Sequence, residues 1–198
     1  PYRNAGVAPL GPPQHPAVPV LYHGLAAAGA GVELAFLPWI DFEEELRRRA
    51  WPLFALESRR PLRAFGLVVI PVLRELHATG VVELLDLGGV PILAAERGER
   101  DPLVVGAGPA LANPEPFAPF FDAVLLGDPE PALAGVVSAA VRFRHGALDR
   151  REVLNALAGI EGVYVPSAID VAPDRDGHLV AVPGTAPIRA RYTAHVPT

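Results

Sequence analysis

The chain of 198 residues contains no cysteine, no methionine and no lysine. Without cysteine it can form no disulfide, offer no thiolate nucleophile, and hold neither a zinc–thiolate site nor an iron–sulfur cluster. Several classes of enzyme are therefore excluded for this chain taken alone. Because the sequence starts at Pro1 and has no methionine, we expect it to be a piece of a longer protein.

Long hydrophobic runs are also missing. The longest apolar runs, such as Gly66–Leu73, fall well short of the roughly 20 residues that a helix needs to cross a bilayer. The first residues do not show the charged and then apolar order of a signal peptide. We therefore expect a cytoplasmic protein that has no membrane partner.

Positive charge is neither abundant nor clustered. The formal net charge is −5, and the arginines form no basic stripe of the kind that binds a phosphate backbone. Nucleic-acid binding by this segment is therefore not expected. Hydrophobic residues make up 51% of the chain, so it can fold around a core, and its length fits one domain with an appendage.

Helical and extended patterns alternate along the middle of the chain. The run Phe65–Pro71 (FGLVVIP) is the best strand, because continuous apolar residues over this length are typical of a strand covered on both faces. Further strands are predicted at 32–37, 91–94, 102–105 and 122–126, and helices at 18–28, 41–49, 74–87, 130–145 and 150–158. The alternation favours an α/β fold with a parallel sheet and flanking helices, since parallel strands need crossover connections.

The pattern makes two further predictions, one about burial and one about organisation. We expect nearly complete burial of the central strand residues Val68, Val69, Ile70, Val104, Val105, Val124 and Leu125. We divide the chain into an irregular proline-rich segment at 1–17, the α/β domain at 18–146, a helix plus β-hairpin extension at 147–182 and a linker at 183–198. Tyr164–Ala172 and His178–Val182 are the expected strands of the hairpin, because a glycine-containing loop joins them.

The loops that follow the strands are the expected ligand site. In an open parallel sheet, ligands bind beyond the carboxyl ends of the strands. Glycines there let the backbone approach a ligand closely, and free amides at helix starts favour anions. The spacing matches neither a P-loop nor a dinucleotide-binding fingerprint. The candidate cofactor-binding residues are Pro71, Val72, Glu75, Gly106, Ala107, Gly108, Pro109, Asn113, Gly127 and Asp128.

Several motifs occur in a fixed order between Tyr22 and the C-terminus. They are Phe36–Glu43 (FLPWIDFE), Pro52–Ser58, Arg74–Leu76, Leu84–Pro91, Asp101–Pro109, Asn113–Pro116, Phe121–Asp122, Gly127–Asp128 and Gly162–Ser167. Taken together, they resemble the N-terminal domain of an uncharacterised family of radical SAM proteins.

The resemblance implies a flavodoxin-like domain of the cobalamin (B12)-binding type, followed in the parent protein by a radical SAM barrel with a CxxxCxxC motif. The barrel would be a partner in cis that holds the 4Fe–4S cluster and S-adenosylmethionine, and residues 183–198 would lead towards it. The chain would then be an accessory cobalamin-binding-type domain that is not catalytic alone. The alternative is a degenerate structural or interaction module of the same family that binds no ligand. A third interpretation is a free-standing binder of a flavin or nucleotide.

His77 and three acidic residues leave two further interpretations open. Glu75–Gly80 resembles the Asp-x-His-x-x-Gly motif that supplies the cobalt ligand in base-off cobalamin proteins, but it follows the predicted strand Phe65–Pro71 instead of the first strand. We therefore favour an ordinary helical histidine and predict no metal site. Asp122, Asp128 and Glu130 could form an acidic site, although turn and cap roles are favoured for Asp122 and Asp128.

Overall fold

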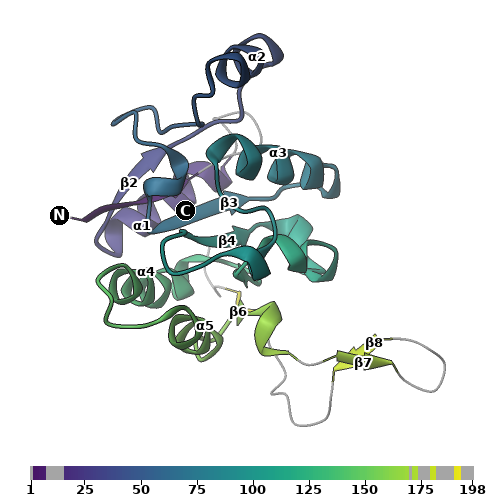
Figure 1. The fold of residues 1–198 in the computed structure, drawn as a ribbon. Helices are drawn as coiled ribbons and strands as arrows, with labels where there is room; N and C mark the ends of the chain where they lie inside the picture. Colours follow the sequence, from purple (N-terminus) through teal and green to yellow (C-terminus); the bar gives the residue numbers. More distant parts are fainter. Residues whose placement is uncertain (1, 8–15, 170, 174–178, 182–189, 193–198) are drawn as a thin grey trace.

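A six-stranded sheet with helices on both faces forms the centre of the molecule (Figure 1). The computed structural model describes residues 2–7, 16–169, 171–173, 179–181 and 190–192. The strands are β1 (Tyr2–Val7), β2 (Ala30–Leu34), β3 (Leu67–Pro71), β4 (Leu103–Ala107), β5 (Ala123–Leu125) and β6 (Val163–Tyr164). They lie in the order β2-β1-β3-β4-β5-β6, and only β6 runs antiparallel to its neighbour. The predicted α/β fold with a mostly parallel sheet is confirmed.

Strand β1 lies inside the sheet, between β2 and β3, where we expected irregular chain. The six prolines among the first 19 residues all fall outside Tyr2–Val7. Every residue of β1 therefore keeps the backbone N–H that a strand with neighbours on both sides needs. The expectation that 1–17 is irregular is wrong for this stretch, and most of the remainder lies outside the described residues.

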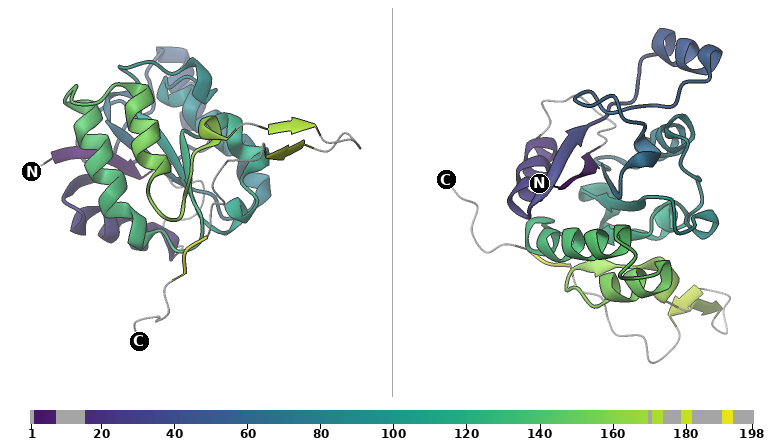
Figure 2. Two further views of the ribbon diagram at one scale, coloured as in Figure 1. Left: turned by 90° about the horizontal axis from the view of Figure 1, so that it is seen from below. Right: turned by 60° about the vertical axis from the view of Figure 1, so that its left-hand side comes forward.

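Five helices accompany the sheet within the described residues: α1 (Ala17–Ala27), α2 (Ile40–Arg49), α3 (Ala78–Gly88), α4 (Glu130–Arg144) and α5 (Arg150–Ala158). Helices α1, α4 and α5 pack on one face of the sheet, whereas α3 packs on the other. Helix α2 projects away from the sheet and buries only Leu46 of its own residues (Figure 2). All five helices had been predicted, although α3 begins at Ala78 instead of Arg74.

The helix ends show which local signals were informative. Asp149 caps α5, because its side chain accepts a hydrogen bond from the backbone N–H of Glu152 at 2.7 Å. Asp41 is not the cap of α2, whose first residue is preceded by Trp39 without a side-chain cap. Leu76 lies within the predicted helix 74–87, but it belongs to the 3₁₀ turn before α3 and is exposed.

The core has two halves, one on each face of the sheet. Successive strand residues point to opposite faces, so Val69 and Val105 contact the α1 and α4 side while Val68 and Val104 contact the α3 side. The predicted burial is confirmed for Val68, Val69, Ile70, Val104, Val105, Val124 and Leu125, each of which is at most 1% exposed. These strands are therefore covered on both faces, as their continuous apolar runs indicated.

Two predicted strands are corrected by the structure. The stretch 91–94 contains no strand and leads into a 3₁₀ turn at Ala94–Glu96. The stretch 164–172 is interrupted by a 3₁₀ turn at Pro166–Ala168, because proline cannot continue the strand hydrogen bonding. Its first part joins the main sheet as β6, and only its last part, β7 (Val171–Pro173), pairs with β8 (Leu179–Ala181).

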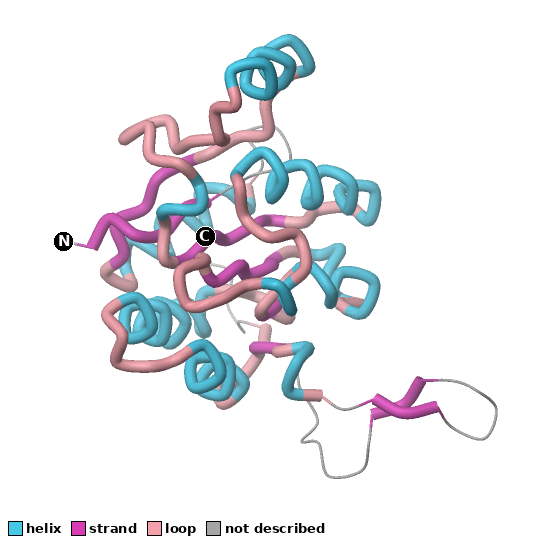
Figure 3. Tube along the Cα trace, viewed as in Figure 1, coloured by secondary structure: helices cyan, strands magenta, loops and turns pink. Residues whose placement is uncertain are grey.

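The β7–β8 pair lies apart from the main sheet (Figure 3). The loop expected to join its strands falls outside the described residues, as does most of the expected linker at 183–198. Among the residues that the structure describes, no helix is both long and apolar enough to cross a membrane.

Candidate functional site

The order in which successive strands are added to the sheet reverses between β1 and β3, at the centre of the sheet. Strand β1 connects through α1 to β2 on one side, whereas β3 connects through α3 to β4 on the other side. In doubly wound sheets, ligands bind at the carboxyl edge near such a reversal. The strand register places Pro71 beside Ala107 and Ala107 beside Leu125, so the three predicted loops start from the same edge.

A cavity of about 450 Å³ lies at this edge, and we call it the carboxyl-edge pocket. Its walls come from the start of α1, the loop after β4, the start of α4 and Tyr192 near the C-terminus. Five of the predicted residues line it: Ala107, Gly108, Pro109, Gly127 and Asp128. A cavity of this size falls in the range of small-molecule sites.

The remaining predicted residues are divided between another cavity and the protein interior. Glu75 and Asn113 line a separate cavity of about 360 Å³, to which Pro109 also contributes. Pro71 and Val72 are buried. The structure therefore brings the predicted loops to one edge but does not gather their residues around one cavity.

The space that we expected beside two glycines is filled by the protein itself. A Cβ atom on Gly106 would lie 2.6 Å from Cδ1 of Leu111 and 3.1 Å from Cε2 of Phe121. Gly108 has a φ of +122°, and a Cβ there would lie 2.5 Å from the backbone oxygen of Val72. These glycines serve close packing within the domain, and the backbone of Gly106, which was expected to approach a ligand closely, is covered by the protein itself.

Residues 190–192, which we call the C-terminal segment, lie along the loop that follows β5. The N–H of Arg191 donates to the oxygen of Leu126 at 2.9 Å, and the N–H of Asp128 donates to the oxygen of Arg191 at 2.7 Å. Gly127 has a φ of +85°, and a Cβ atom there would collide with the oxygen of Arg191. A glycine is therefore needed at residue 127 for the C-terminal segment to lie along the pocket.

His77 and the three acidic residues take separate places. His77 is half-buried in the 3₁₀ turn before α3. Asp128 and Glu130 both line the carboxyl-edge pocket, whereas Asp122 precedes β5 and lies at the opposite edge of the sheet. No group of three or more His, Cys, Asp or Glu side chains that could hold a metal is found within the described ranges.

Asp122 is the centre of a buried ion triad with Arg97 and Arg150. Its Oδ2 accepts a hydrogen bond from Nη1 of Arg97 at 3.0 Å and from the N–H of Val104 at 2.8 Å. Its Oδ1 accepts from Nη2 of Arg150 at 2.7 Å. The favoured turn or cap role for Asp122 is therefore wrong, because its carboxylate is the buried counter-ion of two arginines.

The two arginines hold further segments at the amino edge. Arg97 donates to the backbone oxygens of Pro91, Ile92 and Phe120, and Arg150 donates to that of Gly98. Burial lowers the pKa of Arg97, and Asp122 partly opposes this shift by favouring the charged guanidinium. The triad thus ties the 91–98 loop to β5 and to the start of α5. Sequence reasoning missed both arginines.

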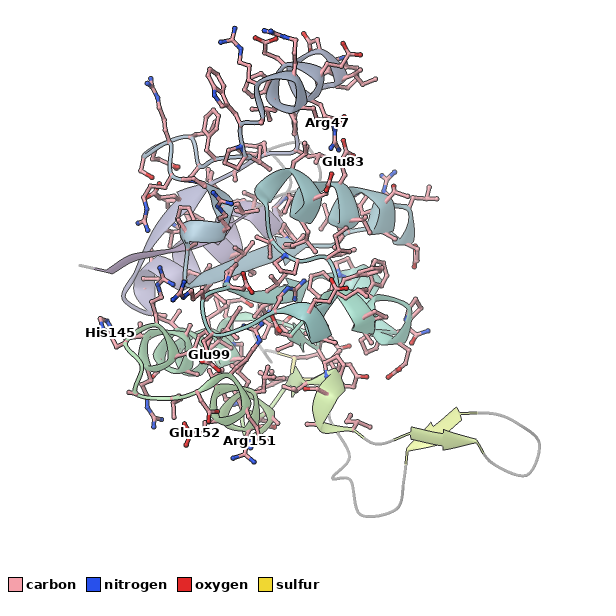
Figure 4. The ribbon with its side chains drawn as sticks, in the orientation of Figure 1. Arg47, Glu83, Glu99, His145, Arg151 and Glu152 are labelled. Atoms are coloured by element: carbon pink, nitrogen blue, oxygen red, sulfur yellow. The ribbon has the colours of Figure 1, made fainter. Side chains whose placement is uncertain are left out.

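Two further polar contacts connect elements away from the pocket. The hydroxyl of Tyr164 on β6 donates to Oε1 of Glu115 at 2.5 Å. Burial is the main cause that raises the pKa of Tyr164, and the hydrogen bond to Glu115 raises it further. Arg47 of α2 donates to Oδ2 of Asp86 on α3 at 2.8 Å and to Oε1 of Glu43 on its own helix at 2.7 Å, and it lies beside Glu83 (Figure 4). Burial and the hydrogen bond with Glu43 raise the pKa of Glu83.

Comparison with known protein families gives a match over most of the chain. The family model described as radical SAM proteins, N-terminal, matches residues 17–166. The matched range runs from α1 through β6 and includes most of the lining of the carboxyl-edge pocket, but neither β1 nor the C-terminal segment. A search among curated proteins found no match.

Proposed function

The chain belongs to the family formed by the N-terminal regions of radical SAM proteins, and we propose that it is an accessory domain whose carboxyl-edge pocket receives cobalamin. In this proposal the radical chemistry takes place in a barrel domain in cis. A chain without cysteine cannot hold the 4Fe–4S cluster used with S-adenosylmethionine, so those groups belong to the rest of the parent protein. This chain binds and positions the cobalamin, and it is not catalytic alone.

The topology supports a flavodoxin-like assignment. Strands β1 to β5 follow the order 2-1-3-4-5, which is the order of flavodoxin-like doubly wound sheets. Strand β6 is an antiparallel addition at the edge beside β5. The carboxyl edge is then the place where a flavodoxin-like domain of the cobalamin-binding type would present its ligand.

The lining of the pocket fits the edge of a corrinoid, a broad ring that carries amide side chains. Its walls include the small or apolar side chains of Ala17, Val20 and Pro109. The carboxylates of Asp128 and Glu130 can accept hydrogen bonds from amide N–H groups. No His, Cys or Met is among the described residues that line the pocket, so these residues offer the cobalt no imidazole, thiolate or thioether ligand. When bound, cobalamin would supply a cobalt centre for one-carbon or electron transfer.

One observation carries the proposal: two of the loops that the sequence singled out, those after β4 and β5, start from one sheet edge and line a cavity there. The test is a titration of the chain with hydroxocobalamin, followed by corrin absorption and gel filtration. We expect a saturable spectral change and co-elution of the corrinoid with the protein. The absence of both would contradict ligand binding.

A matched pair of variants locates the bound corrinoid. Ala112 is exposed and lines the carboxyl-edge pocket, so Ala112→Trp would fill the cavity. Ala134 is exposed on α4 and lines no part of the pocket, so Ala134→Trp makes the same chemical change elsewhere. We expect only Ala112→Trp to weaken binding, by about tenfold or more. Equal affinities in the two variants would place the corrinoid at another site.

The alternative function is a structural module that packs against the barrel without a ligand. The packing at Gly106 favours it, because Leu111 and Phe121 occupy the space beside this candidate cofactor-binding residue. In that case the titration shows no spectral change, and the chain still binds a separately produced barrel in gel filtration. Loss of both activities would contradict both functions.

A further inference from the structure

A larger cavity lies at the other edge of the sheet. It has a volume of about 520 Å³, and we call it the amino-edge cavity. The residues before β5, the start of α5 and the turn after β6 form its walls. Most of its lining is apolar and includes Leu93, Pro119, Phe121 and Leu154. Such a cavity suits a small ligand with an apolar body.

The buried ion triad and Ser167 form the polar part of this lining, and the charges of the triad do not cancel. Arg97 and Arg150 carry two positive charges, whereas Asp122 carries one negative charge. Both oxygens of Asp122 are already engaged by the two guanidiniums and by the N–H of Val104. The triad therefore presents an excess positive charge that no side chain in the cavity lining neutralises.

The guanidinium of Arg150 has N–H groups for which the described residues supply no hydrogen-bond acceptor. Within the described residues its guanidinium donates two hydrogen bonds, to Gly98 and Asp122, although a guanidinium has five N–H groups. Its side chain is 11% exposed, whereas that of Arg97 is fully buried and donates four hydrogen bonds. Arg150 is therefore the residue able to contact a ligand in the cavity.

Nearby carboxylates do not take up this capacity. Glu99 accepts a hydrogen bond from the backbone N–H of Arg150 at 3.0 Å and is exposed. Asp101 favours the charged form of Arg97 and accepts a hydrogen bond from the N–H of Gly98. Neither side chain lines the cavity.

We propose that the amino-edge cavity binds a small molecule with one carboxylate and a short apolar body. The carboxylate accepts hydrogen bonds from the guanidinium of Arg150, since guanidinium and carboxylate match in charge and in planar geometry. The apolar body lies against Leu93, Pro119 and Leu154. This site is separate from the carboxyl-edge pocket and does not depend on cobalamin binding.

The proposal is tested with three probes of equal chain length: hexanoate, hexanol and hexylammonium. Each is titrated into the 198-residue chain, and binding is followed by the thermal midpoint and by the NMR signals of arginine Nε. We expect saturable binding of hexanoate with a shift of one arginine Nε signal, and at least about tenfold weaker binding of hexanol and hexylammonium. Equal affinities for the three probes, or no saturable binding of hexanoate, would overturn the proposal.

Variants at the cavity wall give a control that does not disturb the triad. Replacing Arg150 would remove one of the two guanidiniums that bind the buried carboxylate of Asp122 and would disturb the triad itself, so it is avoided. Ser167 is exposed and lines the cavity, and Ser167→Glu places a repelling carboxylate there. Ser138→Glu makes the same change on the exposed surface of α4. We expect only Ser167→Glu to weaken hexanoate binding, by about tenfold; an equal loss in both variants would contradict the site.

Discussion

The two edges of the sheet are built in different ways. At the amino edge, side chains far apart in the sequence meet in a buried ion triad that fastens loops to one another. At the carboxyl edge, backbone groups and small residues predominate, and the C-terminal segment is attached by backbone hydrogen bonds. One edge is therefore held by specific charged partners, and the other depends on the absence of side chains at Gly108 and Gly127.

This difference indicates which edge of the sheet can change its conformation while the domain stays folded. Removing one member of a buried ion triad leaves an uncompensated charge in the interior, which is among the costliest changes in a protein. Displacing a short segment held by two backbone hydrogen bonds and the exposed ion pair between Arg191 and Glu161 costs much less. We therefore expect the amino edge to determine stability and the carboxyl edge to tolerate movement.

The largest expected effect comes from Asp122→Asn. Arg97 and Arg150 would lose their shared counter-ion, so the free energy of unfolding should fall by about 3–5 kcal/mol. Asp128→Asn makes the same change at the carboxyl edge and should cost about 1 kcal/mol or less. Urea denaturation of both variants measures the difference. If Asp122→Asn cost no more than Asp128→Asn, the contrast between the edges would not hold.

A smaller effect is expected from Gly127→Ala, with Gly146→Ala as its control. Both glycines have positive φ, +85° and +70°, so each alanine adds strain of roughly 1–2 kcal/mol. Only at residue 127 would the new Cβ collide with Arg191, because nothing lies within 4 Å of a Cβ at residue 146. Hydrogen exchange should show loss of protection for the N–H groups of Arg191 and Asp128 in Gly127→Ala alone. Retained protection would show that the segment is held by other contacts.

Tyr164→Phe tests a contact that belongs to neither edge. The loss of its hydrogen bond to Glu115 should cost about 1–2 kcal/mol near neutral pH. Because the pKa of Tyr164 is raised in the folded protein, its contribution is present below the ordinary value of 10.0 and is lost as the pH rises above it. Wild type and variant should therefore converge at alkaline pH in urea denaturation. A difference that stays constant with pH would contradict this origin.

The smallest effect is expected for Glu83→Gln, between α2 and α3. Burial and Glu43 raise the pKa of Glu83, so the wild-type carboxyl stabilises the fold most below its unfolded pKa and loses this contribution as the pH rises through the folded pKa. The variant should equal wild type near pH 3 and be slightly more stable near pH 7. Thermal midpoints at the two pH values measure this. Lower stability at pH 7 would indicate that the negative charge supports the fold.

The central strands could be predicted from sequence because a local pattern specified them. Phe65–Pro71 is apolar without interruption, and β3 lies within it, covered on both faces. Strand β1 has the sequence YRNAGV, which shows neither an apolar run nor a clear alternation, and prolines surround it. Its place inside the sheet comes from pairing with β2 and β3, which are distant in sequence. The residues of β1 and their neighbours in sequence do not indicate this pairing with distant strands.

The candidate site was predictable to a similar extent. Glycine and proline after each strand indicated the carboxyl edge, and Gly108 and Gly127 do line the pocket there. The buried ion triad could not be found in this way, because Arg97 and Arg150 are 25 and 28 residues from Asp122. The C-terminal segment carries no signal either, since backbone hydrogen bonds and an exposed ion pair between Arg191 and the distant Glu161 attach it.

The C-terminal segment also offers a position at the carboxyl edge to which a probe can be attached. Tyr192 is 72% exposed and yet lines the carboxyl-edge pocket, so a group attached there would stay at the mouth of the cavity. A short tether of this kind gives an effective concentration in the millimolar range. Because the chain has no cysteine, Tyr192→Cys would provide a unique thiol for a fluorescent dye. The labelled protein would report occupancy of the pocket without any change to its other walls.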